Sequence, residues 1–99
     1  MHKEVLQKAI KTYGTHNQML KCIEECGELS RAISRILIEL SSGDGFTTEA
    51  SQENLYEEMA DVHIMLEQLM MMFDCGDEVF AWNLKKIKRL KERLEHGKI

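Results

Sequence analysis

The chain has 99 residues, of which 43% are hydrophobic and 30% charged, with a net charge of −4 and no proline. This length predicts a single domain over residues 1–99, and the composition excludes a disordered chain. The acidic balance argues against a nucleic-acid polymer as partner. No apolar run is long enough for a signal peptide or a membrane span, so we expect a cytoplasmic protein with no membrane partner.

Two helices are predicted in the first part of the chain. Helical periodicity indicates the first over about residues 2–13, and Gly14 is expected to end it. Thr15 is expected to cap the second helix, about 16–41, in a capping box with Gln18. The apolar stripe of the second helix has the spacing of a coiled-coil seam: Cys22, Cys26, Leu29, Ile33, Ile36 and Leu40.

Two further helices follow the Gly/Ser-rich loop at 41–51. Ser51 is the predicted N-cap of a third helix, about 51–73. The segment "DCGD" (74–77) predicts a tight break, with Asp77 capping a fourth helix, about 77–95. We expect the apolar stripe of the fourth helix to face inward: Phe80, Leu84, Ile87, Leu90 and Leu94. The fold class is therefore all-α, a four-helix bundle-like subunit.

Carboxylates accompany the apolar stripe of the second helix. At about 100° per residue, Glu25 and Glu28 lie about 60° apart on the flank of this stripe. Gln18 and Lys21 share that flank, whereas Glu24 is rotated further toward solvent. A single glutamate in such a place is usually an edge residue that reaches water, but a pair on one helical face is a more specific pattern.

The third helix carries a similar pair. The same projection puts Glu58 at the centre of the apolar stripe and Asp61 about 60° to one side. An unpaired buried carboxylate costs several kcal/mol, so it needs a basic partner, a shifted pKa or a metal ion. If the second and third helices pack antiparallel, the E-x-x-E and E-x-x-D pairs meet in one pocket. Hard oxygen ligands at that density suit Mg²⁺, with Mn²⁺ as an alternative.

At these residues the chain resembles a known family. "EECGE" (24–28) followed by "EEMAD" (57–61) resembles the E-E-x-x-E…E-x-x-D signature of the all-α nucleoside triphosphate pyrophosphohydrolases, the MazG-like branch. The resemblance covers roughly residues 16–95. It implies Mg²⁺-dependent hydrolysis of a (deoxy)nucleoside triphosphate to the monophosphate and pyrophosphate. The metal ligands would be Glu25, Glu28, Glu58 and Asp61.

The resemblance also implies roles for other residues. Glu24 would position or deprotonate the attacking water, or hold a second metal ion. Asn83 and Lys86 on the last helix would contact phosphate or sugar. Gln18, with Lys21 beside it, would also bind the substrate, with Gln18 at the edge of its base. Which nucleotide is bound is left open.

Assembly and a different function class complete the expectations. The helices carry more apolar surface than one small core needs, which predicts a homodimer or homotetramer. The resemblance adds that the last helix completes a neighbour's pocket. The alternative to an enzyme is a small helical oligomerisation or interaction module whose acidic cluster is structural.

Overall fold

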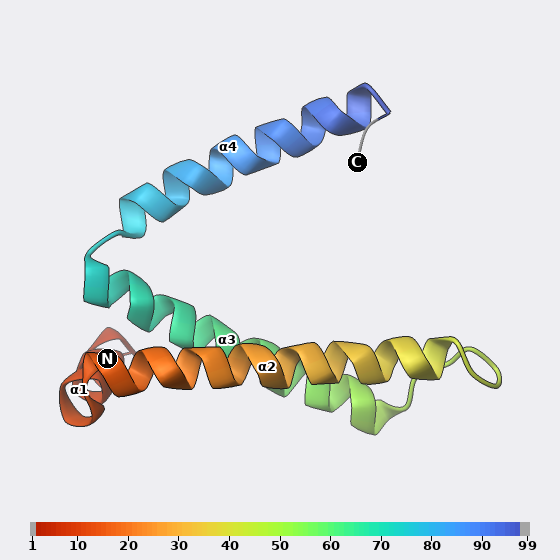
Figure 1. Cartoon of the computed structure of the whole chain (residues 1–99), viewed down its shortest axis with the longest axis horizontal. Helices are drawn as coiled ribbons and strands as arrows, with labels where there is room; N and C mark the ends of the chain where they lie inside the picture. Colours follow the sequence, from red (N-terminus) through yellow and green to blue (C-terminus); the bar gives the residue numbers. More distant parts are fainter. Residues whose placement is uncertain (1, 98–99) are drawn as a thin grey trace. The chain divides into compact units, whose positions relative to one another are not determined.

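The computed structural model describes residues 2–97, which contain four α-helices and, over that range, no strand. The helices are α1 (His2–Tyr13), α2 (Thr15–Leu40), α3 (Glu49–Phe73) and α4 (Gly76–Glu95) (Figure 1). The prediction of an all-α fold is confirmed. Contacts group the chain into two compact units, one up to Leu69 and the other from Met70 onward. None of the helices within 2–97 combines the length and the apolar character that a bilayer crossing requires.

Gly14 forms the junction between α1 and α2. Its backbone has φ 90° and ψ 150°, a conformation that glycine reaches without steric cost. Its N–H donates to the carbonyl of Ile10 at 2.8 Å and so ends α1. The predicted capping box of Thr15 and Gln18 is wrong, because Gly14 itself occupies the N-cap position and no side chain caps α2. The Gln18 side chain is used in a different contact, described below.

The start of α3 also differs from the prediction. Ser51 is not the N-cap, because the helix already begins at Glu49 and the Ser51 N–H donates to Thr48 Oγ1 at 3.1 Å. The Thr48 N–H donates in turn to Glu39 Oε1 at 2.9 Å, and the Ser51 hydroxyl donates to the other oxygen of Glu39. In a capping box the acidic side chain of the same helix accepts a hydrogen bond from the N–H of the N-cap residue, and here Glu39 of α2 accepts that bond instead. These bonds tie together the two ends of the loop that joins α2 to α3.

Within the first unit, α2 and α3 run side by side and antiparallel. Gln18 of α2 contacts Gln68 of α3, and Glu39 contacts Ser51. The residue number of the contact rises along α2 and falls along α3, so the two helices run in opposite directions, as the ribbon in Figure 1 also shows. The apolar residues buried in this unit are few and small in total volume: Leu6, Cys22, Ala32 and Met65. Polar side chains are buried beside them, so the interface between α2 and α3 is partly polar.

The second unit begins with the end of α3. Asp74 has a left-handed backbone (φ 48°), and the Cys75 N–H donates to the Met70 carbonyl at 3.1 Å. The Asp74 N–H donates to the Met71 carbonyl at 3.3 Å, which completes a Schellman motif. The predicted break between the third and fourth helices is confirmed, but it covers only residues 74 and 75 of the predicted 74–77. Asp77 is not a cap, however, because α4 begins at Gly76 and Asp77 lies in its first turn, where a negative charge still stabilises a helix.

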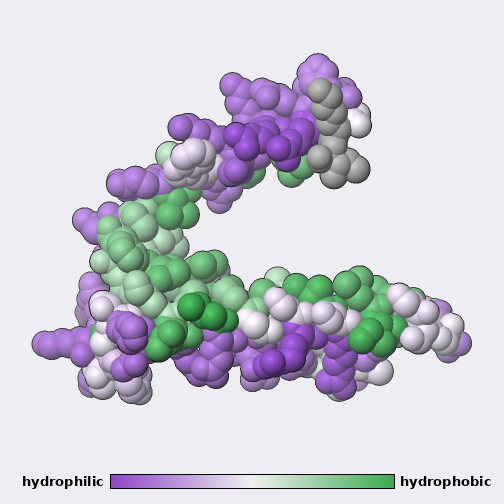
Figure 2. Space-filling view, viewed as in Figure 1, coloured by the Kyte–Doolittle hydropathy of each residue, from purple (hydrophilic) through white to green (hydrophobic). Residues whose placement is uncertain are grey.

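The apolar stripe of α4 is exposed in the single chain. The exposed fractions are 63% for Phe80, 59% for Ile87 and 66% for Leu94, and no residue of α4 is buried. No described residue of the second unit covers this stripe, and the prediction that it faces inward stays a prediction. Basic residues follow the stripe, and the surface over the second half of α4 is largely hydrophilic in Figure 2. An amphipathic helix normally buries its apolar stripe, so α4 is a candidate for contact with a partner.

Candidate metal centre

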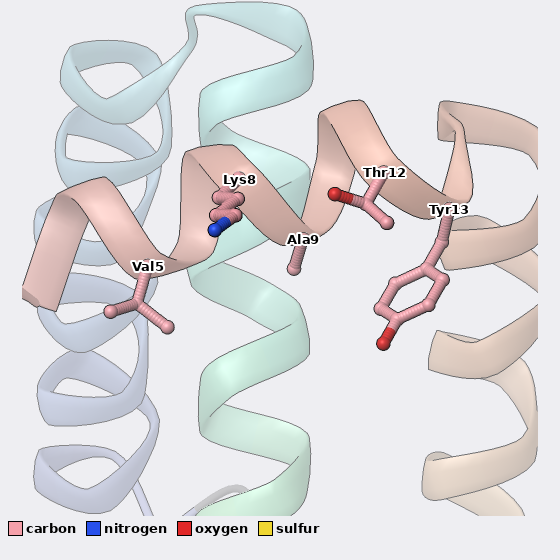
Figure 3. Close-up of a pocket in the computed structure, with 5 residues that line it drawn as sticks. All are labelled: Val5, Lys8, Ala9, Thr12 and Tyr13. Carbon is pink, nitrogen blue, oxygen red and sulfur yellow. The ribbon is translucent and has the colours of Figure 1, made fainter.

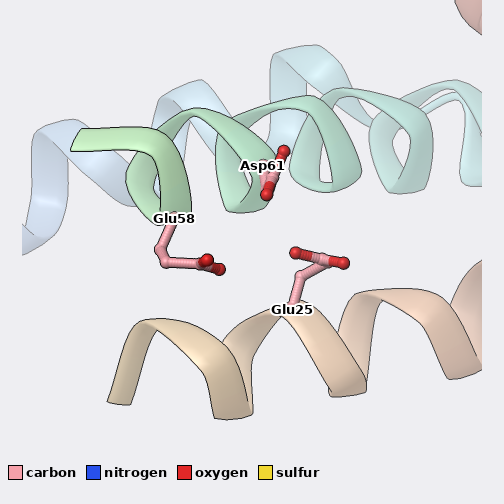
Figure 4. Close-up of side chains that lie close together, drawn as sticks. All are labelled: Glu25, Glu58 and Asp61. Carbon is pink, nitrogen blue, oxygen red and sulfur yellow. The ribbon is translucent and has the colours of Figure 1, made fainter. Parts of the chain in front are cut away.

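Three carboxylates converge between α2 and α3. Glu25 comes from α2, and Glu58 and Asp61 lie one turn apart on α3. One oxygen from each lies within 4.8 Å of the others, and Figure 4 shows the two α3 side chains directed toward Glu25. Glu25 is buried and the other two are half-buried. We call Glu25, Glu58 and Asp61 the carboxylate cluster.

The negative charge of the cluster is incompletely compensated. Glu58 Oε2 is shielded from solvent and has no hydrogen-bond partner among the described residues. The lost hydration raises the pKa of Glu58 above its usual value, and the charges of Asp61, Glu25 and Glu28 raise it further. The pKa of Asp61 is raised too, first by burial and then by Glu25. Both shifts report an environment that disfavours the ionised carboxylates.

Lys21 is the basic group beside the cluster. Its Nζ lies 3.2 Å from Glu25 Oε1 and 3.9 Å from Glu24 Oε1, all three residues being on α2. The bond to Glu25, followed by the charge of Glu24, raises the pKa of Lys21. The lysine is half exposed, so its ion pairs are screened by water and contribute little. Lys21 therefore offsets part of the charge of Glu25 and leaves that of Glu58 without a partner.

Two predicted acidic residues stand outside the cluster. Glu28 forms an ion pair with Arg31 on α2, although its charge still contributes to the raised pKa of Glu58. Glu24 is 63% exposed in its side chain and lies toward Lys21. Of the four predicted metal ligands, the structure brings three together and places the fourth nearby.

The cluster has the chemistry of a magnesium or manganese site. All its donors are carboxylate oxygens, which Mg²⁺ and Mn²⁺ prefer, and one of them, on Glu58, is buried without a partner. One oxygen from each of the three side chains lies within 4.8 Å of the others, so the three carboxylates would hold one cation between them. The residues that are present therefore fit the divalent cation that the sequence predicts.

A pocket of about 380 Å³ lies next to the cluster and is lined by Tyr13, Gln18, Lys21 and Met65. We call it the Gln18 pocket. Gln18 Nε2 donates to Gln68 Oε1 at 2.8 Å, and both side chains are buried. Gln68 and Met65 were not predicted to belong to the site. The signal was present, because Met65 and Gln68 continue on α3 the helical spacing that starts with Glu58 and Asp61.

Two other hollows contain none of the predicted site residues. One, of about 490 Å³, is almost wholly apolar and is lined by Met19, Cys22, Ile23, Cys26 and Leu69. The pKa of Cys22 is raised by burial, which favours an unreactive thiol. The other follows α1, from which Val5, Ala9 and Tyr13 project on one side (Figure 3).

The remaining predicted residues lie on α4. Asn83 and Lys86 both have exposed side chains. Both belong to α4 and so to the second unit, whereas the carboxylate cluster belongs to the first. Trp82 is also exposed, and Lys85 Nζ lies 4.9 Å from the centre of its ring. A role for these residues at the carboxylate cluster stays a prediction.

The described residues define a helical protein with a carboxylate cluster between two antiparallel helices. Comparisons with protein-family models, curated proteins and solved structures find no match for the chain. Function must therefore be inferred from the chemistry of the site.

Proposed function

We propose that the protein hydrolyses a (deoxy)nucleoside triphosphate between its α- and β-phosphates in a Mg²⁺-dependent reaction, giving a monophosphate and pyrophosphate. The observation that carries the proposal is the convergence of Glu25, Glu58 and Asp61, with one Glu58 oxygen buried and unpartnered. The resemblance of the two acidic motifs to those of MazG-like pyrophosphohydrolases supports the choice of reaction.

The proposed roles follow from where each side chain lies. The carboxylate cluster would hold the cation, with Glu28 as a further ligand once it leaves Arg31. Mg²⁺ bound there would supply charge neutralisation for the phosphates and a Lewis acid for the transferring phosphorus. Glu24 is exposed and is proposed to accept a proton from water, with Lys21 holding its carboxylate. Lys21 would also offer a positive charge to the phosphates, because its ammonium has three donors.

We further propose that the functional unit is a homodimer or homotetramer. The uncovered apolar stripe of α4 supports this, and α2 also exposes Ile33 and Leu40 of its own stripe and Leu37 and Ile38 beside it. Monomers rarely expose so much contiguous apolar surface. Asn83 and Lys86 would then reach the site of a neighbouring copy, where they would bind phosphate or sugar.

The exposed stripe of α4 also favours the second candidate, a helical oligomerisation or interaction module. In that case the acidic cluster would be a structural feature and the protein would release no product from nucleotides. A binding partner other than a second copy would be expected to cover the stripe.

The experiment compares Glu58→Gln with the matched variant Glu53→Gln, which removes an exposed glutamate from the same helix. Binding of Mn²⁺ is followed by electron paramagnetic resonance, and turnover is followed as released pyrophosphate. We expect Glu58→Gln to lose both, while circular dichroism remains unchanged, and Glu53→Gln to keep both. In the absence of metal, Glu58→Gln is expected to melt at least as high as the wild type, because a poorly solvated charge is removed. Near-normal turnover by Glu58→Gln would show that the proposed metal site is wrong.

A further inference from the structure

The Gln18 pocket is placed to receive the base of a bound nucleotide. It shares Lys21 with the carboxylate cluster, since the same ammonium lies 3.2 Å from Glu25 and lines the pocket. Tyr13 contributes an exposed ring to the wall, and aromatic rings stack readily on bases. A nucleotide whose triphosphate is held at the carboxylate cluster therefore has the Gln18 pocket, in the same helical unit, for its base.

The orientation of the Gln18 amide is fixed by its neighbours. Gln68 Nε2 donates to the sulfur of Met65 at 3.9 Å, and a thioether can only accept. This contact favours the orientation in which the Gln68 oxygen faces Gln18, which donates to it through Nε2 at 2.8 Å. The reversed arrangement would set Gln68 Oε1 against a sulfur that cannot donate. Gln18 Oε1 is consequently left as an acceptor, and no donor of the described residues bonds to it.

The acceptor is recessed. Gln18 is only 8% exposed, and it meets the pocket through that small part of its side chain. An exocyclic amino group projects beyond the ring of a base and can reach a recessed acceptor. The ring N–H of uracil, thymine or hypoxanthine has at least one neighbouring oxo group, which would meet the wall or the lone pairs of Gln18 first. A base without a projecting donor would leave the acceptor unpaired, which is the strongest basis for discrimination.

Resting on the proposed function, we propose that the Gln18 pocket selects cytosine and adenine over uracil and hypoxanthine, in which an oxo group replaces the exocyclic amino group. Gln18 is the specificity-determining residue, and Gln68 with Met65 are positioning residues that occupy its Nε2 and leave its oxygen free to accept.

The test uses neutral nucleosides, so that neither metal binding nor turnover is needed. Binding of deoxycytidine and deoxyuridine, and of deoxyadenosine and deoxyinosine, is measured by ligand-observed NMR titration. We expect the amino member of each pair to bind about tenfold more tightly. Gln18→Met keeps the side-chain length and removes the acceptor, and it should abolish the preference. Gln68→Met frees the Gln18 amide to rotate and should weaken the preference, whereas Gln7→Met, at an exposed site on α1, should leave it unchanged.

Equal binding within the pairs, tighter binding of the oxo members or no nucleoside binding at all would overturn this selectivity. These results would leave the proposed function intact if pyrophosphate is still released from nucleotides. The wild-type comparison decides the question even where Gln18→Met does not fold. Conversely, an amino preference without pyrophosphate release would support the pocket and reject the proposed reaction.

Discussion

Replacing Gln68 with leucine tests the polar contact that joins α2 to α3. Gln68 is 3% exposed and accepts a hydrogen bond of 2.8 Å from Gln18, which is 8% exposed. Gln68→Leu leaves a buried N–H donor without its partner, which costs about 1–3 kcal/mol of unfolding free energy. Because Gln18 lines a pocket that water can enter, we expect the lower half of this range. A loss of about 1–2 kcal/mol lowers the melting temperature of a domain of this size by roughly 4–16 °C.

The double variant separates a lost bond from altered packing. Replacing both Gln18 and Gln68 with leucine removes donor and acceptor together, which is expected to cost less than the sum of the single changes. The assay is urea denaturation followed by circular dichroism at one fixed protein concentration, since assembly shifts apparent stability. We expect a coupling energy of about 1–2 kcal/mol. Gln7→Leu on the surface of α1 is the control, and additivity of the two substitutions within about 0.3 kcal/mol would refute the reasoning.

Three further results are expected. Gly14→Ala should destabilise the protein by about 1–3 kcal/mol, because the backbone φ at this position is 90°. Gly27→Ala within α2 should stabilise it by about 0.5–1 kcal/mol, and at both positions a new Cβ meets no atom within 4 Å. Urea titrations that give both variants the same sign of stability change would contradict this. The Ser51 hydroxyl and then the Thr48 N–H lower the pKa of Glu39 in the folded protein below the ordinary value of 4.5. The stability that Glu39 confers is therefore present above pH 4.5 and is lost as the pH falls through the pKa of the folded state. The urea midpoint of the wild type should therefore exceed that of Glu39→Gln at about pH 6 and approach it at about pH 3; a constant gap would exclude the ionised carboxylate as the cause. Light scattering at micromolar concentration should give a dimer or tetramer, and Ile87→Glu on α4 should shift it toward 11.5 kDa, whereas a stable, active wild-type monomer would contradict the proposed assembly.

Periodicity in the sequence was sufficient to predict the helices. Long apolar repeats without proline predict helices whatever their neighbours, so the four predicted ranges agree with the observed ones to within two residues at every end. The caps were harder to predict, because capping depends on tertiary contacts as well as on residue type. Thr48 replaces Ser51 as the cap of α3 because Glu39, nine residues earlier, reaches its N–H. No local pattern in the sequence contains that contact.

Helical periodicity also made the carboxylate cluster predictable. Helical projection alone placed Glu25, Glu58 and Asp61 on or beside the apolar faces of their helices. Antiparallel packing of α2 and α3 then brings the three side chains together. The projection could not foresee that Glu28 would take Arg31 as its partner, because side-chain torsions decide between two nearby charges. The Gln18–Gln68 bond was not predicted, although Gln68 continues on α3 the spacing of Glu58 and Asp61, because an uncharged glutamine on a helical face gives no sign of its partner.

The most direct test of the proposed function is ³¹P NMR of the products formed from a panel of nucleoside triphosphates, with Mg²⁺ and with EDTA in excess. With Mg²⁺, at least one nucleotide should give the monophosphate and pyrophosphate in equal amounts, and EDTA should stop the reaction because the carboxylate cluster then lacks its cation. The resonances of a diphosphate and orthophosphate as the first products, or an unchanged spectrum across the whole panel, would contradict a pyrophosphohydrolase built on Glu25, Glu58 and Asp61.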